Sequence, residues 1–112
     1  FSNYPIEMSA EVEKNTRHAY HLFILRINKN ICGISRDEFI MKMNDKKIGC
    51  GVHYQAIPQH PFYKKRFGWK ENDFQNSIDF GNETVSIPLS GSLKDIQVER
   101  VTNAVKEILY AK

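Results

Sequence analysis

The longest apolar run of the chain lies at 19–27 and alternates with the period of a β-strand. Both sets of alternating side chains in 18–27 are largely apolar, so the pattern predicts a strand that is packed on both faces. A second strand is predicted at 48–54. A third is predicted at 85–89, where Pro88 favours a strand end or the edge of a sheet.

Two helices are predicted from their capping residues and apolar stripes. Ser35 and Glu38 have the spacing of a capping box, and the helix that follows should end near Lys47. Ser92 is expected to cap the last helix of the chain, with Asp95 at its third position. The remaining predictions are two short helices and one loop, at 62–67, 73–83 and 29–34.

Together these elements predict one α+β domain. The expected architecture is a two-layer sandwich of a small, mainly antiparallel three-stranded sheet and three or four helices. A chain of 112 residues has the usual size of one compact domain. Residues 1–16 are polar and poorly periodic, so we expect them to lead into the domain from a longer protein. Gly49 and Gly51 share one face of the second strand, which is typical of a close approach by a backbone or a ligand.

The chain is mildly basic, with a net charge of +3 and a pI near 8.9. Its densest basic patch lies at 64–70, where cations alternate with Phe67 and Trp69. Such a patch can bind a phosphate backbone, or it can be the solvated end of a helix beside packed aromatic rings. No recognised nucleic-acid motif accompanies the patch, which favours the helix end.

The sequence shows neither a secretory leader nor a membrane segment. It lacks the basic and then apolar arrangement of a leader, and the run at 19–27 is far shorter than the roughly 20 residues that span a bilayer. The two cysteines, Cys32 and Cys50, have neither a disulfide framework nor metal-ligand spacing. We therefore expect a cytoplasmic protein with reduced thiols and no membrane partner.

Four histidines raise the question of a metal site. His18 and His21 are three residues apart, which suits a metal on a helix but places them on opposite faces of a strand. No carboxylate cluster or cysteine pair supports them, so no zinc site is expected. Instead, His18 should mark the start of the first strand, and His21 should be half-buried with a bonded ring nitrogen.

No catalytic nucleophile or acid–base pair is predicted. The chain has no Gly-x-Ser-x-Gly turn and no phosphate-binding glycine loop. The carboxylates of Glu7, Glu11 and Glu13 favour a charged face over a general acid–base pair.

The remaining chemistry lies in 51–63, where a strand with glycines leads into a proline-broken loop rich in His, Gln and aromatic residues. His53, Tyr54 and His60 supply neutral hydrogen-bonding groups together with flat apolar faces, which suit a sugar ring or a nucleotide. Such loops often carry binding groups when rigid elements hold them. The alternative is a packed aromatic loop, in which side chains such as Tyr63 are buried against the sheet.

Several short motifs in 17–110 follow one another in a fixed order. They are Ala19-Tyr20-His21-Leu22-Phe23, Arg36-Asp37-Glu38, Ile48-Gly49-Cys50-Gly51-Val52-His53-Tyr54, His60-Pro61-Phe62-Tyr63, Arg66-Phe67-Gly68 and Ser86-Ile87-Pro88-Leu89-Ser90. In their order and spacing, the chain resembles the C-terminal region of the DegT/DnrJ family of pyridoxal-phosphate sugar aminotransferases.

The resemblance implies the C-terminal small domain of a fold-type I aminotransferase, at 17–112, with 1–16 leading in from a missing large domain. The parent enzyme would be a homodimer. It would transfer an amino group, commonly from glutamate, to a keto carbon of a nucleotide-linked sugar, in the biosynthesis of surface polysaccharides or amino sugars. No nucleic-acid partner is implied.

The resemblance also implies which residues do what. The family's Schiff-base lysine and most groups that hold pyridoxal phosphate belong to the large domain, so this chain alone is expected to be inactive and to bind no cofactor. By position, His53, Tyr54 and His60 are expected to contact the sugar nucleotide without taking part in bond breaking. Residues 55–57 fall where the family varies, so the particular sugar is not predicted.

One alternative comes from a different class of protein. The chain would be a stand-alone α+β module that binds a nucleotide or a small metabolite without catalysis. The two interpretations differ in whether the parent gene encodes an upstream large domain with a Schiff-base lysine.

Nucleic-acid binding through 64–70 can be tested by its dependence on salt. Release of counterions would make binding to a DNA oligonucleotide fall steeply between about 50 and 200 mM salt. We expect fluorescence anisotropy to show weak binding at the lower concentration and no such steep loss. A steep response would contradict the interpretation of this patch as a packed helix end.

Overall fold

The computed structural model describes residues 1, 3–10 and 12–110, and a three-stranded antiparallel sheet lies at its centre. The strands, in their order across the sheet, are β1 (Glu7–Met8), β2 (Phe23–Arg26) and β3 (Thr84–Ile87). β2 pairs with β3 along its whole length, with Leu25 opposite Val85 and Ile24 opposite Ser86. The predicted antiparallel arrangement is confirmed.

Within the described residues the chain forms five α-helices and two 3-10 turns. The helices are α1 (Lys29–Cys32), α2 (Arg36–Asp45), α3 (Pro61–Phe67), α4 (Gln75–Glu83) and α5 (Asp95–Tyr110), and the turns are Ile57–Gln59 and Glu71–Phe74. The four predicted helices, which follow Ser35, lie at 62–67 and 73–83, and follow Ser92, are confirmed as α2, α3, α4 and α5. The fold class is α+β. None of the helices that the structure describes has the length and apolar character needed to cross a membrane.

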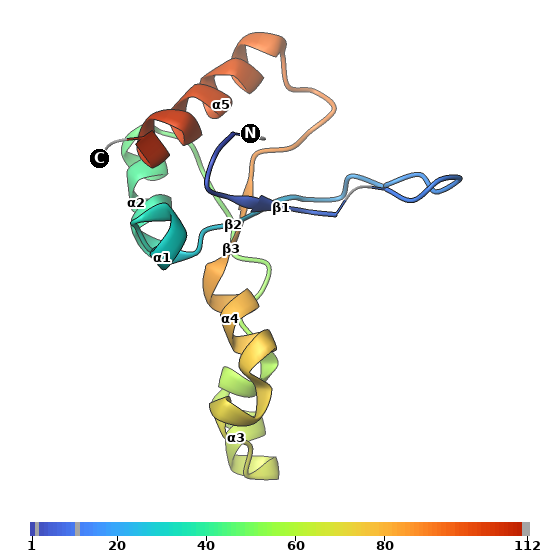
Figure 1. The fold of residues 1–112 in the computed structure, drawn as a ribbon, viewed down its shortest axis with the longest axis vertical. Coiled ribbons are helices and arrows are strands. Elements are labelled where there is room, and N and C mark those ends of the chain that lie inside the picture. The colour runs from blue at the N-terminus through green and yellow to red at the C-terminus, as the bar shows by residue number, and fades with distance from the viewer. Residues whose placement is uncertain (2, 11, 111–112) are drawn as a thin grey trace.

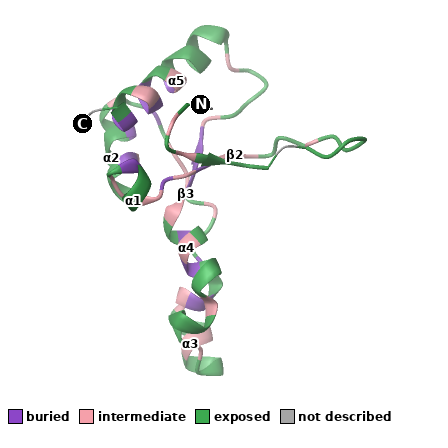
Figure 2. Cartoon of the chain, viewed as in Figure 1, coloured by how far each residue is buried: buried purple, intermediate pink, exposed green. Residues whose placement is uncertain are grey.

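α1, α2 and α5 lie on one side of the sheet and enclose the hydrophobic core (Figures 1 and 2). Leu25 and Val85 face each other across β2 and β3, and both are fully buried. Phe39 and Met43 from α2 and Val105 from α5 belong to the same core and are also fully buried. The sheet and these helices are the two layers of the predicted sandwich.

The other face of the sheet is polar. Because side chains alternate along a strand, Thr84 and Ser86 point away from the core helices, and so does Arg26 in β2. The guanidinium of Arg26 donates to Glu83 at 2.5 Å and to Glu7 at 2.8 Å. These ion pairs join β2 to β1 and to the end of α4.

Two segments project from this body (Figure 1). One is the hairpin arm (residues 9–22), which links β1 to β2, and the other is the lobe (residues 56–83), which contains α3 and α4. The radius of gyration is 15.8 Å, whereas ~13 Å is usual for a compact chain of about this length. Both projections carry exposed apolar side chains, such as Tyr20 in the arm and Phe62 in the lobe.

The first strand is shorter than the predicted 18–27. Tyr20 has a positive φ of 48°, and its backbone N–H donates to Nδ1 of His18 at 2.8 Å. This local bond uses a donor that a strand ladder would need, so the segment before Phe23 continues the arm instead. The prediction that both faces are packed was also wrong: the described helices cover one face, and Ile24 on the other is partly exposed.

The strand predicted at 48–54 is reduced to a single bridge. The N–H of Gly51 donates to the C=O of Ser86 at 2.9 Å, and the N–H of Ser86 donates back at 2.8 Å. Ile48 is tied to the end of α2 by its N–H bond to the C=O of Met43, at 3.0 Å. Since glycines also weaken a strand, the chain meets β3 at one residue only. The third strand is β1, from a segment in which no element was predicted.

The capping box of α2 is confirmed, and the cap predicted for α5 was wrong. The N–H of Ser35 donates to the carboxylate of Glu38 at 2.7 Å, and the N–H of Glu38 donates to the Ser35 hydroxyl at 3.2 Å. α5 begins at Asp95, so Ser92 lies outside it. The Ser92 hydroxyl instead pairs with the hydroxyl of Ser90 at 2.9 Å, in the segment before α5.

The loop predicted at 29–34 contains the single turn of α1. The side chain of Asn28 accepts a hydrogen bond from the N–H of Asn30 at 3.0 Å and so caps the turn. Gly33 ends it with a φ of 76°, a conformation that glycine adopts without strain. The prediction missed this turn because a four-residue helix is too short to show helical periodicity.

Close packing fixes the lobe where α4 passes the loop after His53. A β-carbon placed on Gly81 would lie 2.8 Å from the backbone N of Ala56 and 2.9 Å from its Cβ. The Arg36 guanidinium donates to the C=O of Gly81 at 3.2 Å and to that of Thr84 at 3.1 Å. The position of the lobe therefore depends on the absence of a side chain at Gly81.

Replacing Gly81 with Ala should lower the free energy of unfolding by about 1–3 kcal/mol, because backbone atoms of Ala56 stand in the way of the new methyl group. Gly49→Ala is the matched control, since no heavy atom lies within 4 Å of a β-carbon there, and it should change stability by less than about 0.5 kcal/mol. Urea denaturation followed by circular dichroism measures both. Equal stability of the two variants would contradict the close packing.

Candidate functional site

His53 lies beside β3, on the sheet face opposite the core helices. The bridge between Gly51 and Ser86 brings the chain alongside β3 two residues before His53. Ser86 points away from the core because its neighbours Val85 and Ile87 point into it. The Ser86 hydroxyl lies 2.9 Å from Nδ1 of His53, so a side chain of the sheet holds the imidazole.

Gly51 leaves room for this ring. A β-carbon at Gly51 would lie 2.5 Å from Cε1 of His53, so the close neighbour of this glycine is a side chain of its own segment and not the predicted backbone or ligand. A β-carbon at Gly49 would have no heavy atom of the described chain within 4 Å. The ring of Tyr54 meets the His53 ring edge-on, with centroids 5.1 Å apart, and Tyr54 is 75% exposed. The pair combines an anchored imidazole with an accessible phenol.

Tyr54 also borders a shallow depression of about 450 Å³ between its own loop and α4. Gln55 and Asn76 line it with amide groups, and Ile57 and Phe80 line it with apolar surface. A sugar ring has hydroxyl groups at its edge and C–H groups on its faces, and this mixture of amide and apolar surface suits both.

His60 does not join His53 and Tyr54. It directly precedes Pro61 at the start of α3, and its ring meets that of Tyr63 edge-on at 6.4 Å. Tyr63 is thus the ring partner of His60 in the described chain. Of the three residues predicted to contact substrate, the structure brings two together and leaves the third in the lobe.

The basic and aromatic patch at 64–70 forms part of a packed cluster. The rings of Tyr63, Phe67 and Trp69 stack on one another, with centroids 6.1, 5.7 and 5.2 Å apart. Lys64 pairs with the carboxylate of Glu71. Because these rings stack on one another, the geometry favours the solvated helix end beside packed aromatic rings over a stacking surface for nucleic-acid bases.

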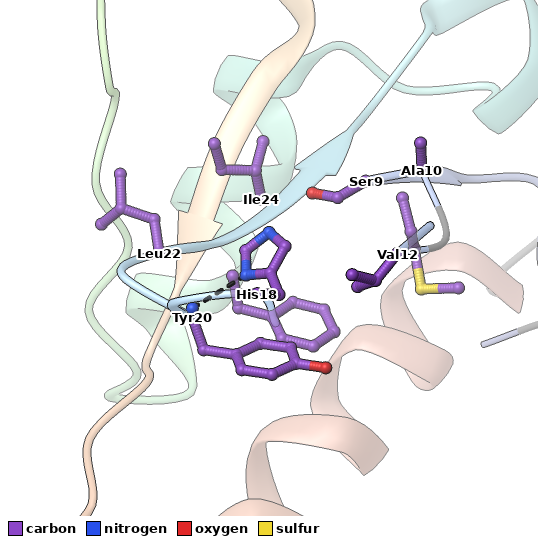
Figure 3. A pocket seen from close by; sticks show the side chains of 9 residues that line it. Ser9, Ala10, Val12, His18, Tyr20, Leu22 and Ile24 are labelled. Carbon is purple, nitrogen blue, oxygen red and sulfur yellow. Dashed lines mark hydrogen bonds between the residues drawn. The ribbon is translucent and has the colours of Figure 1, made fainter. Parts of the chain in front are cut away.

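The sequence did not reveal a hollow of about 310 Å³ at the base of the hairpin arm (Figure 3). Ser9 and Val12 line it from the outgoing part of the arm, and His18 and Tyr20 line it from the returning part. The hydrogen bond between the Tyr20 N–H and Nδ1 of His18 joins two of the lining residues and is the dashed line in Figure 3. The motif at 19–23 supplies Tyr20, Leu22 and Phe23 to this hollow, but only the fold brings the two parts of the arm together.

The histidines of the arm do not form a metal site. Within the described residues, no group of three His, Cys, Asp or Glu side chains could hold a metal ion. His18 is partly buried and its Nδ1 is hydrogen-bonded, whereas His21 is exposed. The prediction had assigned the bonded ring nitrogen to His21, and it was wrong because β2 begins only at Phe23, which leaves His21 in the exposed arm.

Two acidic residues near the N-terminus, Glu7 and Glu13, lie in the sheet and on the surface of the arm. Glu7 pairs with Arg26 at 2.8 Å across β1 and β2. Glu13 is exposed in the arm, and Glu11 lies outside the described residues. For Glu7 and Glu13 the predicted charged face fits better than an acid–base pair.

None of the lysines that the structure describes lies in the desolvated setting that favours a Schiff base. A Schiff-base lysine reacts through its neutral amine, which a desolvated pocket favours. Every lysine that the structure describes is exposed or partly exposed. Of the partly exposed ones, Lys46 pairs with Glu107, Lys64 pairs with Glu71, and Lys106 lies over the ring of Tyr4. The hollow in the arm is lined by neither lysine nor arginine.

The fold as a whole is that of a sugar aminotransferase domain. It matches the structure of a candidate sugar aminotransferase from Streptococcus pneumoniae with a TM-score of 0.83 and 23% sequence identity. The match covers 97% of this chain and 27% of that chain. The form of that protein with pyridoxal phosphate gives the same TM-score, 0.83.

Sequence comparison identifies the family. The model of the DegT/DnrJ/EryC1/StrS aminotransferase family matches residues 1–106, so the chain belongs to this family. It is 36% identical over 110 residues to the spore coat polysaccharide biosynthesis protein SpsC of Bacillus subtilis, covering 97% of this chain and 28% of that protein. It is 32% identical over 100 residues to the UDP-4-amino-4-deoxy-L-arabinose–oxoglutarate aminotransferase of Shewanella sediminis, covering 86% and 26%. The chain thus spans little more than a quarter of these relatives' length.

Both cysteines are free thiols with low reactivity. Cys32 is buried, and its thiol donates to the C=O of Pro5 at 2.9 Å. Burial raises the pKa of the Cys32 thiol and also that of the half-buried Cys50. Since the thiolate is the nucleophile, neither residue is set up for covalent catalysis at neutral pH.

A thiol-reactive disulfide reagent should therefore modify Cys50 slowly at neutral pH and Cys32 only when the chain unfolds. Absorbance of the released thiolate measures the rate, and Cys50→Ser isolates the signal of Cys32. Raising the pH should speed the reaction of Cys50, because more of the thiol is then ionised. Fast modification of Cys32 in the folded chain would contradict its burial.

Proposed function

We propose that this chain is the C-terminal small domain of a pyridoxal-phosphate-dependent aminotransferase that acts on a nucleotide-linked keto sugar. Membership in the aminotransferase family supports this proposal. So do the relatives named for polysaccharide biosynthesis and for amino transfer to a UDP-linked sugar. Residues 17–112 would be the domain, and 1–16 would lead in from the large domain and add β1 to its sheet.

The observation that carries the proposal is the paired arrangement of His53 and Tyr54. The imidazole is held by Ser86 on the sheet face opposite the core helices, and the Tyr54 ring beside it is exposed above a shallow depression. An imidazole and a phenol offer hydrogen bonds together with flat surfaces, which sugar hydroxyls and sugar C–H faces match. In this proposal both residues bind and orient the sugar nucleotide. His60 would contact it from the lobe.

The chemistry of amino transfer would come from outside this chain. Pyridoxal phosphate supplies the electron sink for that reaction when it is bound. None of the lysines described here is desolvated, so the Schiff-base lysine would belong to the large domain. The complete enzyme would be a cytoplasmic homodimer with glutamate as amino donor. The exposed apolar side chains of the arm and the lobe would then contact the rest of the assembly.

The purified chain should show neither the absorbance band of bound pyridoxal phosphate nor amino transfer from glutamate to a UDP-linked keto sugar. Spectrophotometric titration with the cofactor and a coupled assay for oxoglutarate measure the two properties. Turnover by this chain alone would contradict its assignment as a small domain.

In the complete aminotransferase, His53→Ala or Tyr54→Ala should lower kcat/KM for the sugar nucleotide roughly tenfold to a hundredfold, since each removes a ligand contact worth about 1–3 kcal/mol. The absorbance of the bound cofactor should be unchanged. Ile96→Ala is the matched control, because Ile96 is 73% exposed, like Tyr54, but lies on α5. Loss of cofactor binding in the His53 variant would contradict its role in substrate binding.

A further inference from the structure

Gly51, His53 and Ser86 form one connected unit on the sheet face opposite the core helices. Two backbone hydrogen bonds join Gly51 to Ser86, at 2.9 and 2.8 Å. The His53 ring occupies the space that a side chain at Gly51 would fill, and its Nδ1 lies 2.9 Å from the Ser86 hydroxyl. The imidazole is therefore fixed both in position and in the direction of its two nitrogens.

The hydrogen bond between Ser86 and His53 bears on which imidazole nitrogen carries the proton. Ser86 is 6% exposed, and Nδ1 of His53 is the hydrogen-bond partner of its hydroxyl among the described residues. A neutral imidazole has one N–H donor and one acceptor nitrogen, and a serine hydroxyl has one hydrogen to donate. If Nδ1 carried the proton, the buried hydroxyl hydrogen would have no acceptor, which is a costly arrangement. If Ser86 donates to Nδ1, both groups are satisfied.

The second nitrogen is available to a ligand. Nε2 of His53 makes no hydrogen bond within the described residues, and it is not among their buried unpartnered atoms, so it reaches solvent. The ring of Tyr54 stands edge-on beside the imidazole and is exposed. A ligand that lies against Tyr54 would thus meet the outward nitrogen of His53.

We propose that Ser86 donates its hydroxyl hydrogen to Nδ1 and so holds neutral His53 as the Nε2–H tautomer. His53 then offers a fixed N–H donor to an acceptor oxygen of the sugar nucleotide, and Ser86 and Gly51 are its positioning residues. For the identity of the ligand, this inference rests on the function proposed above. The tautomer itself is a property of the chain without ligand.

Long-range proton–nitrogen NMR correlation of the chain, labelled with ¹⁵N-histidine, tests the tautomer directly. The spectrum is recorded at a pH where the imidazole is neutral, and His53→Gln identifies the His53 resonances by their loss. We expect the Nε2–H tautomer to exceed the other by about tenfold or more. In Ser86→Ala this excess should fall to that of the exposed His21 in the same spectrum. A dominant Nδ1–H tautomer, or an excess that Ser86→Ala leaves unchanged, would overturn the inference.

Two glycine variants control for general disturbance of the loop. Gly51→Ala should displace the ring and reduce the excess in the same way, because the new methyl group would overlap Cε1 of His53. Gly49→Ala, two residues away in open space, should leave the tautomer ratio of His53 unchanged. Equal effects of the two glycine variants would show that loop disturbance, not loss of the Ser86 bond, sets the ratio, and would overturn the inference.

Kinetics of the complete aminotransferase test the donor with a UDP-linked keto sugar as the probe. The amide N–H of Gln reaches about as far as Nε2, whereas that of Asn reaches about as far as Nδ1. His53→Gln should therefore keep KM within about threefold of wild type, and His53→Asn should raise it about tenfold. If the NMR result holds but neither variant changes KM, the sugar-nucleotide role fails and the tautomer stands. If the NMR result fails, the positioning role of Ser86 fails whatever the kinetics.

Discussion

Two backbone hydrogen bonds between Gly51 and Ser86 attach the loop that carries His53 and Tyr54 to the sheet. Ser86 lies between Val85 and Ile87, whose side chains are buried against the core helices. Because a strand alternates its side chains, packing of this core face forces the Ser86 hydroxyl to the opposite face. A shift of one residue in the pairing of β3 would place a valine or an isoleucine where His53 now finds its partner. The hydrophobic core thus determines the geometry of the candidate site.

Local chemistry made several elements predictable from the sequence. Ser35 and Glu38 cap α2 as expected, because both partners of a capping box lie within one turn of each other. Non-local pairing was not predictable in the same way. β1 has only two residues, which pair with Arg26 and Leu25 of β2, and the segment 48–54 makes a single bridge, between Gly51 and Ser86. A strand of two residues leaves almost no periodicity in the sequence, and the alternation at 48–54 does not reveal that only Gly51 pairs with β3.

The candidate site, too, was predictable from the sequence only in part. His53 and Tyr54 follow from motif order, and the structure places their rings side by side. His60 follows from the same motifs, yet it lies with Tyr63 in the lobe. The role of Ser86 could not be read from the sequence, since its bond to His53 joins residues 33 positions apart. The sequence pointed to the residue that we propose to contact a ligand, and the fold identified the Ser86 hydroxyl that bonds it.

The central claim is that His53 and Tyr54 present a sugar-nucleotide surface that is completed by the rest of an aminotransferase. The most direct measurement is a crystal structure of the complete enzyme with a nucleotide-linked sugar bound. The account predicts an oxygen of that ligand within hydrogen-bond distance, roughly 2.7–3.2 Å, of Nε2 of His53, with the Tyr54 ring against the sugar or nucleotide. A ligand bound elsewhere, with His53 and Tyr54 covered by protein, would contradict it.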